Sequence, residues 1–305
     1  MKGGDYYGFS SSSAFWSAED FSAPQALGTS AANWLSDVIM RCDNPYISGG
    51  AAYGCGQCRP CRINRRRLWT RRMMLERLCH REACFLGLSY HDLRLPLTTD
   101  GIGLLATGMG LPTLRPKDLQ DWLKRLRKAI SPLKVRYYGV GEYGDKTYRP
   151  HYHVVLYGYP QCVRGVTLGY PYKSRWRECC VHCRLLGETW GMGDIVSGSV
   201  TNDSCSYCAG YTVKKMTALD DTRLFGRHPE FARMSLRPGI GADAMFDVAS
   251  ELMKHGLDES MVDVPSTLRS GPKIGPIGRY LKGKLREYVG REAGTPQEVL
   301  DEWLS

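Results

Sequence analysis

Residues 135–159 read VRYYGVGEYGDKTYRPHYHVVLYGY, with two runs rich in tyrosine and valine on either side of GDKTYRP. Aromatic and β-branched residues favour strands, and the turn-forming segment between the runs predicts a hairpin. Successive side chains of a strand point to opposite faces, so His151 and His153 share one face and Tyr152 points to the other. Glu142, near the end of the neighbouring strand, is placed to meet the histidines across the hairpin.

Two imidazoles and a carboxylate with open coordination positions suit a catalytic divalent ion. Mg²⁺ and Mn²⁺ are the candidates, and the histidines favour Mn²⁺. The alternative is that His151 and His153 are ordinary strand residues without a ligand.

The segments around the hairpin predict the fold class. FLGLSY at 85–90 is typical of a buried strand, and a helix is expected to begin at Pro116. Apolar residues recur along this helix at helical spacing: Leu119, Trp122, Leu123, Leu126 and Ile130. Strand, helix, strand, strand is a fragment of the split βαβ arrangement. We therefore expect an α+β fold, with an antiparallel sheet of about five strands, helices on one face and the active site on the other.

A second helix, expected from about Asp203 to Thr217, carries two tyrosines. Tyr207 and Tyr211 lie one turn apart on one face, and Lys214 falls between their directions while Lys215 lies further round. A tyrosine hydroxyl has an unperturbed pKa of about 10, so it attacks a phosphate only when a cation assists. The alternative is that both tyrosines pack the helix against the sheet.

The charge of the chain indicates a polyanionic partner. Its 305 residues carry a net charge of +10, and nucleic acid is the first candidate. A helix expected from about Arg62 to Glu82 concentrates arginines that would contact phosphates: Arg65, Arg66, Arg67, Arg71 and Arg72. A solvated basic face is the alternative reading. Aromatic residues that would stack on bases are Tyr137, Tyr138, Tyr143, Tyr148 and Trp190.

The chain contains twelve cysteines. We see no membrane-spanning run and no secretory signal, so we expect a reducing cytosol and no membrane association. Structural zinc is suggested by Cys55, Cys58 and Cys61, which need a fourth ligand from elsewhere. Cys180-x2-Cys183 and Cys205-x2-Cys208 resemble a knuckle pair, with Cys162 and Cys179 as competing ligands. Reduced, buried cysteines are the alternative.

The composition divides the chain into three parts. Residues 1–50 form an irregular arm, residues 51–225 hold the motifs, and residues 226–305 form a helical appendage. Within the appendage we expect helices near 242–255 and 277–289, separated by a Pro/Gly loop at 265–276.

Four segments together resemble a known family: CGQCRPCRINRRRLW (55–69), GEYGDKTYRPHYHVVLYG (141–158), ETWGMG (188–193) and YCAGYTVKKMT (207–217). The chain is similar to replication initiators of small single-stranded DNA bacteriophages, of the gokushovirus branch of the microviruses. These proteins carry the HUH endonuclease pattern of rolling-circle replication, which residues 51–225 would then hold together with cysteine-rich inserts.

The resemblance implies a role for each matching residue. His151 and His153 would be metal ligands, Glu142 the upstream acidic ligand, and Tyr207 and Tyr211 the pair of a two-tyrosine initiator. Lys214 and Lys215 match the lysines that follow the tyrosines in the family.

The implied activity is nicking of the viral-strand origin through a 5′-phosphotyrosine, followed by strand transfer that circularises the genome. The implied partners are the single-stranded origin, a host helicase and a host DNA polymerase, in the host bacterial cytoplasm. Two alternatives remain: a non-catalytic, basic, zinc-containing nucleic-acid-binding protein, and a metal hydrolase that uses water as its nucleophile.

Overall fold

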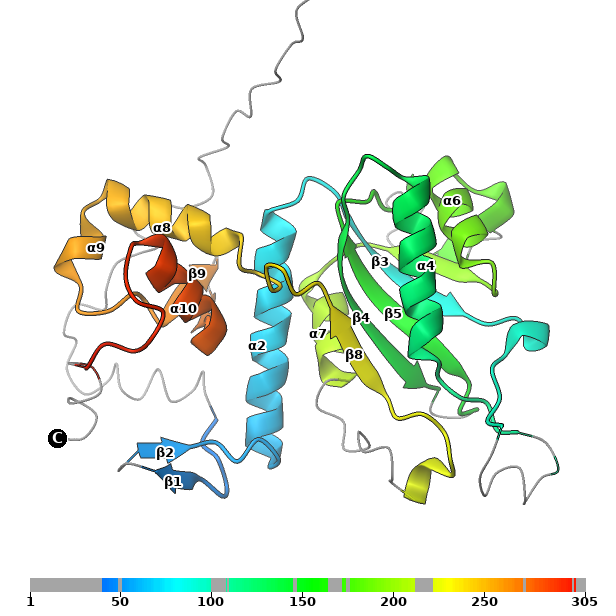
Figure 1. Ribbon diagram of the computed structural model, residues 1–305, viewed down its shortest axis with the longest axis horizontal. Helices are drawn as coiled ribbons and strands as arrows, with labels where there is room; N and C mark the ends of the chain where they lie inside the picture. Colours follow the sequence, from blue (N-terminus) through cyan, green and yellow to red (C-terminus); the bar gives the residue numbers. More distant parts are fainter. Residues whose placement is uncertain are drawn as a thin grey trace, which may run out of the picture. The chain divides into compact units, whose positions relative to one another are not determined.

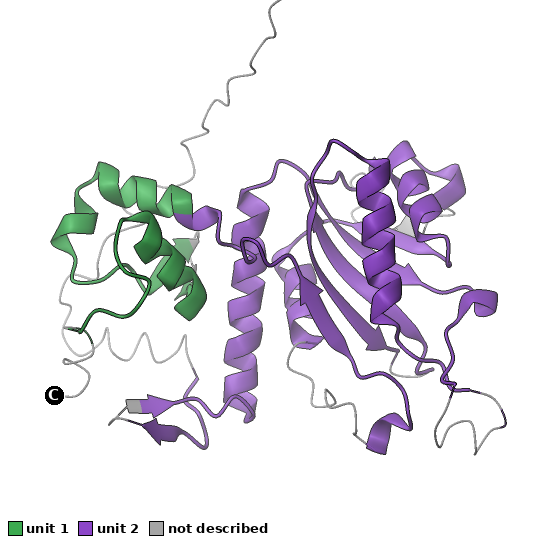
Figure 2. Ribbon diagram, in the orientation of Figure 1, with its two compact units in different colours: residues 1–39, 246–305 green, residues 40–245 purple. Residues whose placement is uncertain are grey.

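The computed structural model describes residues 40–48, 51–99, 108, 110–144, 147–163, 172–173, 176–211, 222–270, 273–297 and 299. Its contacts divide the chain into two compact units (Figure 2). The sheet unit comprises residues 40–245, and the second unit comprises residues 246–305 together with residues 1–39. The predicted N-terminal arm lies, up to residue 39, outside the described residues.

The sheet unit is built on a six-stranded antiparallel sheet (Figure 1). Its order is β6-β7-β3-β5-β4-β8, which confirms the predicted α+β class. The strands are β3 (Ala83–Ser89), β4 (Arg136–Tyr143), β5 (Pro150–Tyr157), β6 (Tyr172–Lys173), β7 (Ile195–Gly198) and β8 (Phe231–Met234). Because β8 pairs with β4, the unit extends to Met245 rather than ending near residue 225.

The predicted hairpin is formed by β4 and β5. Glu142 lies directly opposite His151, and Val140 lies opposite His153. On its other side β5 pairs with β3, so that Gly87 lies opposite His153. The two histidines therefore stand in the middle of the sheet and not at an edge.

One face of the sheet is covered by α4 (Pro116–Ala129) and α6 (Val181–Trp190). The predicted apolar stripe of α4 is buried, and its Trp122 meets Trp190 of α6 edge to face with ring centroids 6.3 Å apart. Tyr152, Val154 and Leu156 of β5 belong to the same core. The alternation along β5 thus sends its apolar side chains to the α4 face.

The opposite face is covered by α2 (Arg59–Leu78) and α7 (Asn202–Tyr211). The expectation that helices would lie on one face only was wrong. The sequence of α2 looks basic throughout, yet Met73 is completely buried against the sheet together with Tyr138. In α7 the buried positions are the small residues Cys205, Cys208 and Ala209, which form no conspicuous apolar stripe.

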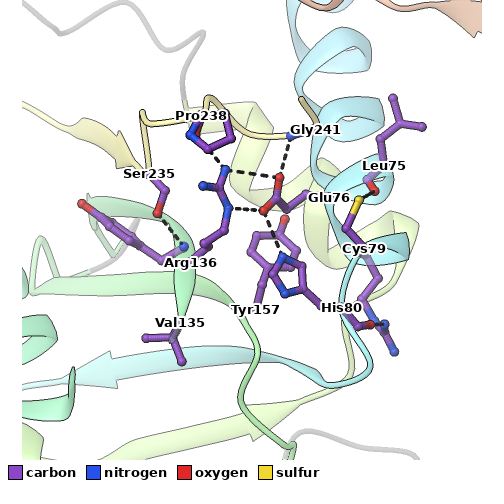
Figure 3. A network of polar contacts seen from close by, with 12 residues as sticks. Leu75, Glu76, Cys79, His80, Val135, Arg136, Tyr157, Ser235, Pro238 and Gly241 are labelled. Atoms are coloured by element: carbon purple, nitrogen blue, oxygen red, sulfur yellow. Dashed lines mark hydrogen bonds and ion pairs between the residues drawn. The ribbon is translucent and has the colours of Figure 1, made fainter. Parts of the chain in front are cut away.

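A buried ion pair fixes α2 to the sheet (Figure 3). Glu76 of α2 is fully buried and pairs with Arg136 of β4. Its carboxylate also accepts the backbone N–H of Gly241 at 2.7 Å and contacts His80 Nε2 at 3.1 Å. Arg136 in turn donates to the carbonyl oxygen of Pro238 at 2.8 Å. The network joins α2, β4 and the segment after β8.

Shorter elements complete the sheet unit. A hairpin of β1 (Tyr46–Ser48) and β2 (Ala51–Tyr53) precedes α2. Three 3₁₀ turns are η2 (Asp92–Arg94), η3 (Trp176–Glu178) and η4 (Thr222–Leu224). No helix among the residues described is long and apolar enough to cross a membrane.

The C-terminal part of the chain contains the two helices expected there, as α8 (Ala244–Lys254) and α10 (Gly278–Tyr288), and a short α9 (Leu257–Ser260). The predicted Pro/Gly loop was wrong, because β9 (Thr267–Ser270) and β10 (Lys273–Pro276) pair there as an antiparallel hairpin. Proline is tolerated at the end of β10, where no further ladder bond is required. Asp263 accepts two hydrogen bonds from Arg286, at 2.8 and 2.7 Å, and fixes α10.

Candidate active site

Glu142, His151 and His153 bring one ligand atom each to a common point, all within 4.8 Å of one another. One oxygen of Glu142 lies 2.7 Å from His151 Nε2 and 2.8 Å from His153 Nε2. The carboxylate is almost fully buried, whereas the histidines are partly exposed. The hairpin register therefore assembles the three residues that the sequence singled out.

The neighbours of the histidines fix their ring orientation. His151 Nδ1 lies 3.1 Å from the carbonyl oxygen of Arg149, which directs Nε2 toward Glu142. His153 stacks on Phe85 of β3, with ring centroids 5.4 Å apart and an interplanar angle of 4°. A backbone carbonyl on the second ring nitrogen is a frequent outer partner of a metal-binding histidine. The donor set and its orientation fit a divalent ion.

Tyr207 of α7 reaches this cluster. Its hydroxyl donates to Glu142 Oε1 at 2.9 Å and lies 3.5 Å from His153 Nε2. Tyr211, one turn later, packs edge-on against Tyr207 with ring centroids 5.0 Å apart, and it also hydrogen-bonds Glu142. Both tyrosines thus converge on the carboxylate between the two histidines.

The electrostatics of the cluster keep both tyrosines protonated. Burial and the Glu142 carboxylate together raise the pKa of Tyr207 to about 12. Burial and Glu142 likewise raise the pKa of Tyr211. Burial acts to raise the pKa of Glu142, but hydrogen bonds from His151, His153 and Tyr211 hold it well below its usual range. Neither hydroxyl can become a nucleophile here without added positive charge.

Lys214 and Lys215 lie outside the described residues. A cation from α2 does reach α7, because Arg66 Nε donates to the carbonyl oxygen of Ser206 at 2.9 Å and to its hydroxyl at 3.0 Å. This serine directly precedes Tyr207. The sequence indicated Arg66 only as one of several phosphate contacts and gave no sign of its bond to the tyrosine helix.

The other arginines of α2 fall into two groups. Arg65 and Arg67 are exposed, like Arg66. Arg72 turns toward the protein, where it donates to the carbonyl oxygen of Ile240 at 3.0 Å and lies over the Trp69 ring at 4.3 Å. Burial lowers the pKa of Arg71 to about 10. The exposed residues 65–67 are therefore the better placed for a solvent-borne phosphate.

Three of the aromatic residues expected to stack on bases are instead core residues. Tyr138, Tyr143 and Trp190 are at most 7% exposed, so that expectation was wrong for them. Their strand and helix positions alternate inward, which the local sequence of aromatic residues alone does not reveal. Tyr137 is half-buried and Tyr148 is exposed.

The cysteines form two further groups that could hold a metal ion. Cys42 joins Cys55, Cys58 and Cys61, and so supplies the fourth ligand that sequence spacing did not identify. The second group is Cys162, Cys179, Cys180 and Cys183. The suggested pairing of Cys180 and Cys183 with Cys205 and Cys208 was wrong, because the latter two are buried on the sheet side of α7.

Comparison with known proteins supports the family suggested by the motifs. Residues 83–216 match a family model of replication-associated proteins of the ORF2 type. The resemblance to phage replication proteins is confirmed. The matched segment runs from the start of β3 past the end of α7, so it contains the histidines, Glu142 and both tyrosines.

The relatives are replication-associated proteins of three viruses. The chain is 31% identical over 170 residues to VP4 of Bdellovibrio phage phiMH2K, covering 56% of this chain and 50% of that protein. It is 28% identical over 195 residues to ORF2 of Spiroplasma virus 4, covering 61% and 55%. It is 24% identical over 250 residues to ORF4 of Chlamydia phage 1, covering 78% and 55%. The chain thus spans about half the length of these relatives, and no solved structure matches it.

Proposed function

We propose that the protein initiates replication of a single-stranded DNA phage by nicking the viral-strand origin and later rejoining the DNA. The observation that carries this proposal is the hydrogen bond between Tyr207 and Glu142, at 2.9 Å, beside His151 and His153. It brings a nucleophile and a metal-ligand set together from elements separated in sequence. Strand-nicking activity also agrees with the names of the relatives, which are replication-associated proteins.

In the proposed reaction the oxygen of Tyr207 attacks the phosphorus of the scissile phosphodiester. The bond from phosphorus to the 3′ oxygen breaks, the tyrosine loses its proton, and the 3′ oxygen takes up a proton. The products are a 5′-phosphotyrosine and a free 3′-hydroxyl. A 3′-hydroxyl of another strand end can reverse the step and release the tyrosine, so rejoining requires no ATP.

The residues of the cluster have separate roles in this reaction. Glu142, His151 and His153 would hold a Mg²⁺ or Mn²⁺ ion, which supplies Lewis-acid polarisation of the phosphate when bound. Glu142 also orients Tyr207 through the hydrogen bond described above. Tyr211 lies close enough to serve as the second tyrosine of a two-tyrosine reaction, one for each nick. Lys214 and Lys215 follow on the same segment and would bind phosphate.

The polyanionic partner is single-stranded DNA, which the exposed arginines at 65–67 would bind through its phosphates. As in the initiators that it resembles, the protein would act in the cytoplasm of the bacterial host. A host helicase and a host DNA polymerase would extend from the 3′-hydroxyl that the nick leaves.

The test is adduct formation on single-stranded fragments that tile the viral strand of the phage genome, incubated with Mn²⁺ and resolved on a denaturing gel. We expect one fragment to be cut, with protein attached to the 5′ end that the cut creates. Tyr207→Phe and Tyr211→Phe test the two nucleophiles, and at least the variant of the attacking tyrosine should lose the adduct. Tyr148→Phe is the matched control, since Tyr148 is exposed and its ring lies against Arg227 rather than in the cluster.

The other outcomes identify the alternatives. Binding without cleavage would overturn the proposal in favour of a non-catalytic nucleic-acid-binding protein. Cleavage without a covalent adduct would overturn the tyrosine mechanism in favour of a metal hydrolase that uses water.

A further inference from the structure

We propose that the sheet unit holds two structural zinc ions, each bound by four cysteine thiolates. The first set is Cys42, Cys55, Cys58 and Cys61, and the second set is Cys162, Cys179, Cys180 and Cys183. We call these the first and second zinc sites. They are separate from the Glu142–His151–His153 cluster, and the proposal does not depend on the nicking reaction.

The sulfur separations fit a single tetrahedral ion. A Zn–S bond of about 2.3 Å in a tetrahedron places the sulfurs roughly 3.8 Å apart. Cys42 Sγ and Cys58 Sγ are 3.7 Å apart, and Cys162 Sγ and Cys179 Sγ are 3.5 Å apart. Within each set all four sulfurs lie within 4.8 Å of one another. These separations far exceed the disulfide bond length of about 2.05 Å.

Backbone donors point at the sulfurs of the first site. The N–H groups of Gln57 and Cys58 donate to Cys55 Sγ at 3.4 and 3.3 Å, and the N–H of Cys55 donates to Cys42 Sγ at 3.2 Å. Gly56 makes this turn possible with a φ of +76°. Amide donors stabilise anionic sulfur, which is the form that binds zinc.

The two sites repeat one local arrangement. Cys58 is the N-cap of α2 and Cys180 is the N-cap of α6, with φ/ψ of −66°/163° and −63°/163°. Neither side chain makes a capping hydrogen bond, and in each helix the next ligand follows three residues later, as Cys61 and Cys183. The positive end of a helix dipole favours the thiolates at both sites. The same geometry in two unrelated loops indicates a shared requirement of the ligand.

Each site would fasten a loop to the start of a helix. The first connects Cys42, before the β1–β2 hairpin, to the helix that carries Arg66. The second connects Cys162, after β5, and Cys179, after η3, to the helix that carries Trp190. Four soft thiolates select zinc, whereas the nitrogen and oxygen ligands at Glu142 suit a harder divalent ion.

The primary test is metal analysis of the purified full-length protein by mass spectrometry after a brief wash with EDTA. We expect two zinc ions per chain. Cys58→Ser and Cys180→Ser should each reduce the count to one, and Cys79→Ser should leave it at two, because Cys79 belongs to neither set. His151→Ala should also leave it at two, which separates these sites from the histidine cluster.

A second measurement uses the wild-type chain alone, in case a variant fails to fold. Stepwise titration with a mercurial thiol reagent should release zinc, detected with a chromogenic chelator, and a cobalt-exchanged sample should show thiolate-to-cobalt charge-transfer absorption. Iron in place of zinc, fewer than two zinc ions in the wild type, or disulfides within either set would overturn the proposal.

Discussion

Replacing Glu76 with glutamine tests whether the buried ion pair holds α2 on the sheet (Figure 3). Glutamine keeps the size of the side chain but removes the charge that faces Arg136. One of its two terminal groups becomes an N–H donor facing either Arg136 or the N–H of Gly241, both of which are donors themselves. The variant therefore loses the ion pair and leaves at least one donor opposite another donor.

The cost follows from the two contacts that the carboxylate makes. Hydrogen bonds that involve a charged group contribute about 1.5–3 kcal/mol each, so losing two gives about 3–6 kcal/mol. Breaking a buried ion pair by removing one partner costs about 3–5 kcal/mol, which is the same range. Glu76 is fully buried and Arg136 nearly so, so little of this is recovered by water. We expect a loss of roughly 3–5 kcal/mol in the free energy of unfolding.

The measurement is urea unfolding followed by tryptophan fluorescence, which reports on the tryptophans of the sheet unit, among them Trp69, Trp122 and Trp190. The matched control is Asp121→Asn, the same change of charge at a solvent-exposed pair with Lys117 on α4. A change at Glu76 no larger than that of the control would refute the reasoning, since it would mean that the pair contributes nothing beyond a surface contact.

The pH dependence provides a second signature of Glu76. Burial opposes its ionisation, but hydrogen bonds from His80, Arg136 and Gly241 lower the pKa of the folded carboxyl below its usual value. The folded state then binds fewer protons than the unfolded state, so the stabilisation is present above the unfolded pKa of about 4.3 and is lost as the pH falls toward the folded pKa. Wild type should lose more stability than Glu76→Gln between pH 5 and pH 3, values that bracket roughly the unfolded pKa.

Three further substitutions have expected outcomes. Glu142→Gln should weaken Mn²⁺ binding at least about tenfold, measured by electron paramagnetic resonance titration, and unchanged affinity would remove Glu142 from the ligand set. Alanine at the three arginines 65–67 should lower the slope of log affinity against log salt by up to about 2, at about 0.7 per phosphate contact on single-stranded DNA, measured by fluorescence anisotropy. An unchanged slope would contradict the phosphate role of this segment. Leu126→Ala should cost about 2–5 kcal/mol in urea unfolding, because Leu126 is completely buried on the core side of α4, whereas Leu133→Ala at an exposed site should change it by about 0.5 kcal/mol or less.

The histidine cluster followed from local rules. The alternation of side chains along a strand put His151 and His153 on one face, and the short hairpin brought Glu142 directly opposite His151. The apolar stripe of α4 was predictable for the same reason, since its period appears in one continuous segment. Such features need no knowledge of distant parts of the chain.

Contacts between distant segments were not predictable in this way. Cys42 reaches Cys55 only because the β1–β2 hairpin reverses the chain between them, and no fixed spacing encodes that return. The contact of Arg66 with Ser206 depends on α2 crossing the same sheet face as α7. Trp190 looked like a stacking residue because burial is decided by tertiary packing and not by residue type.

The order of the strands also bears on the tendency of the protein to aggregate. The long strands β3, β5 and β4, of seven, eight and eight residues, are adjacent in the interior of the sheet, where both of their sides are paired. The edges are β6 and β8, of two and four residues. Short edge strands leave few unpaired backbone groups to template the addition of a strand from another molecule. We therefore expect the folded sheet unit to resist edge-to-edge association at the concentrations reached during phage replication.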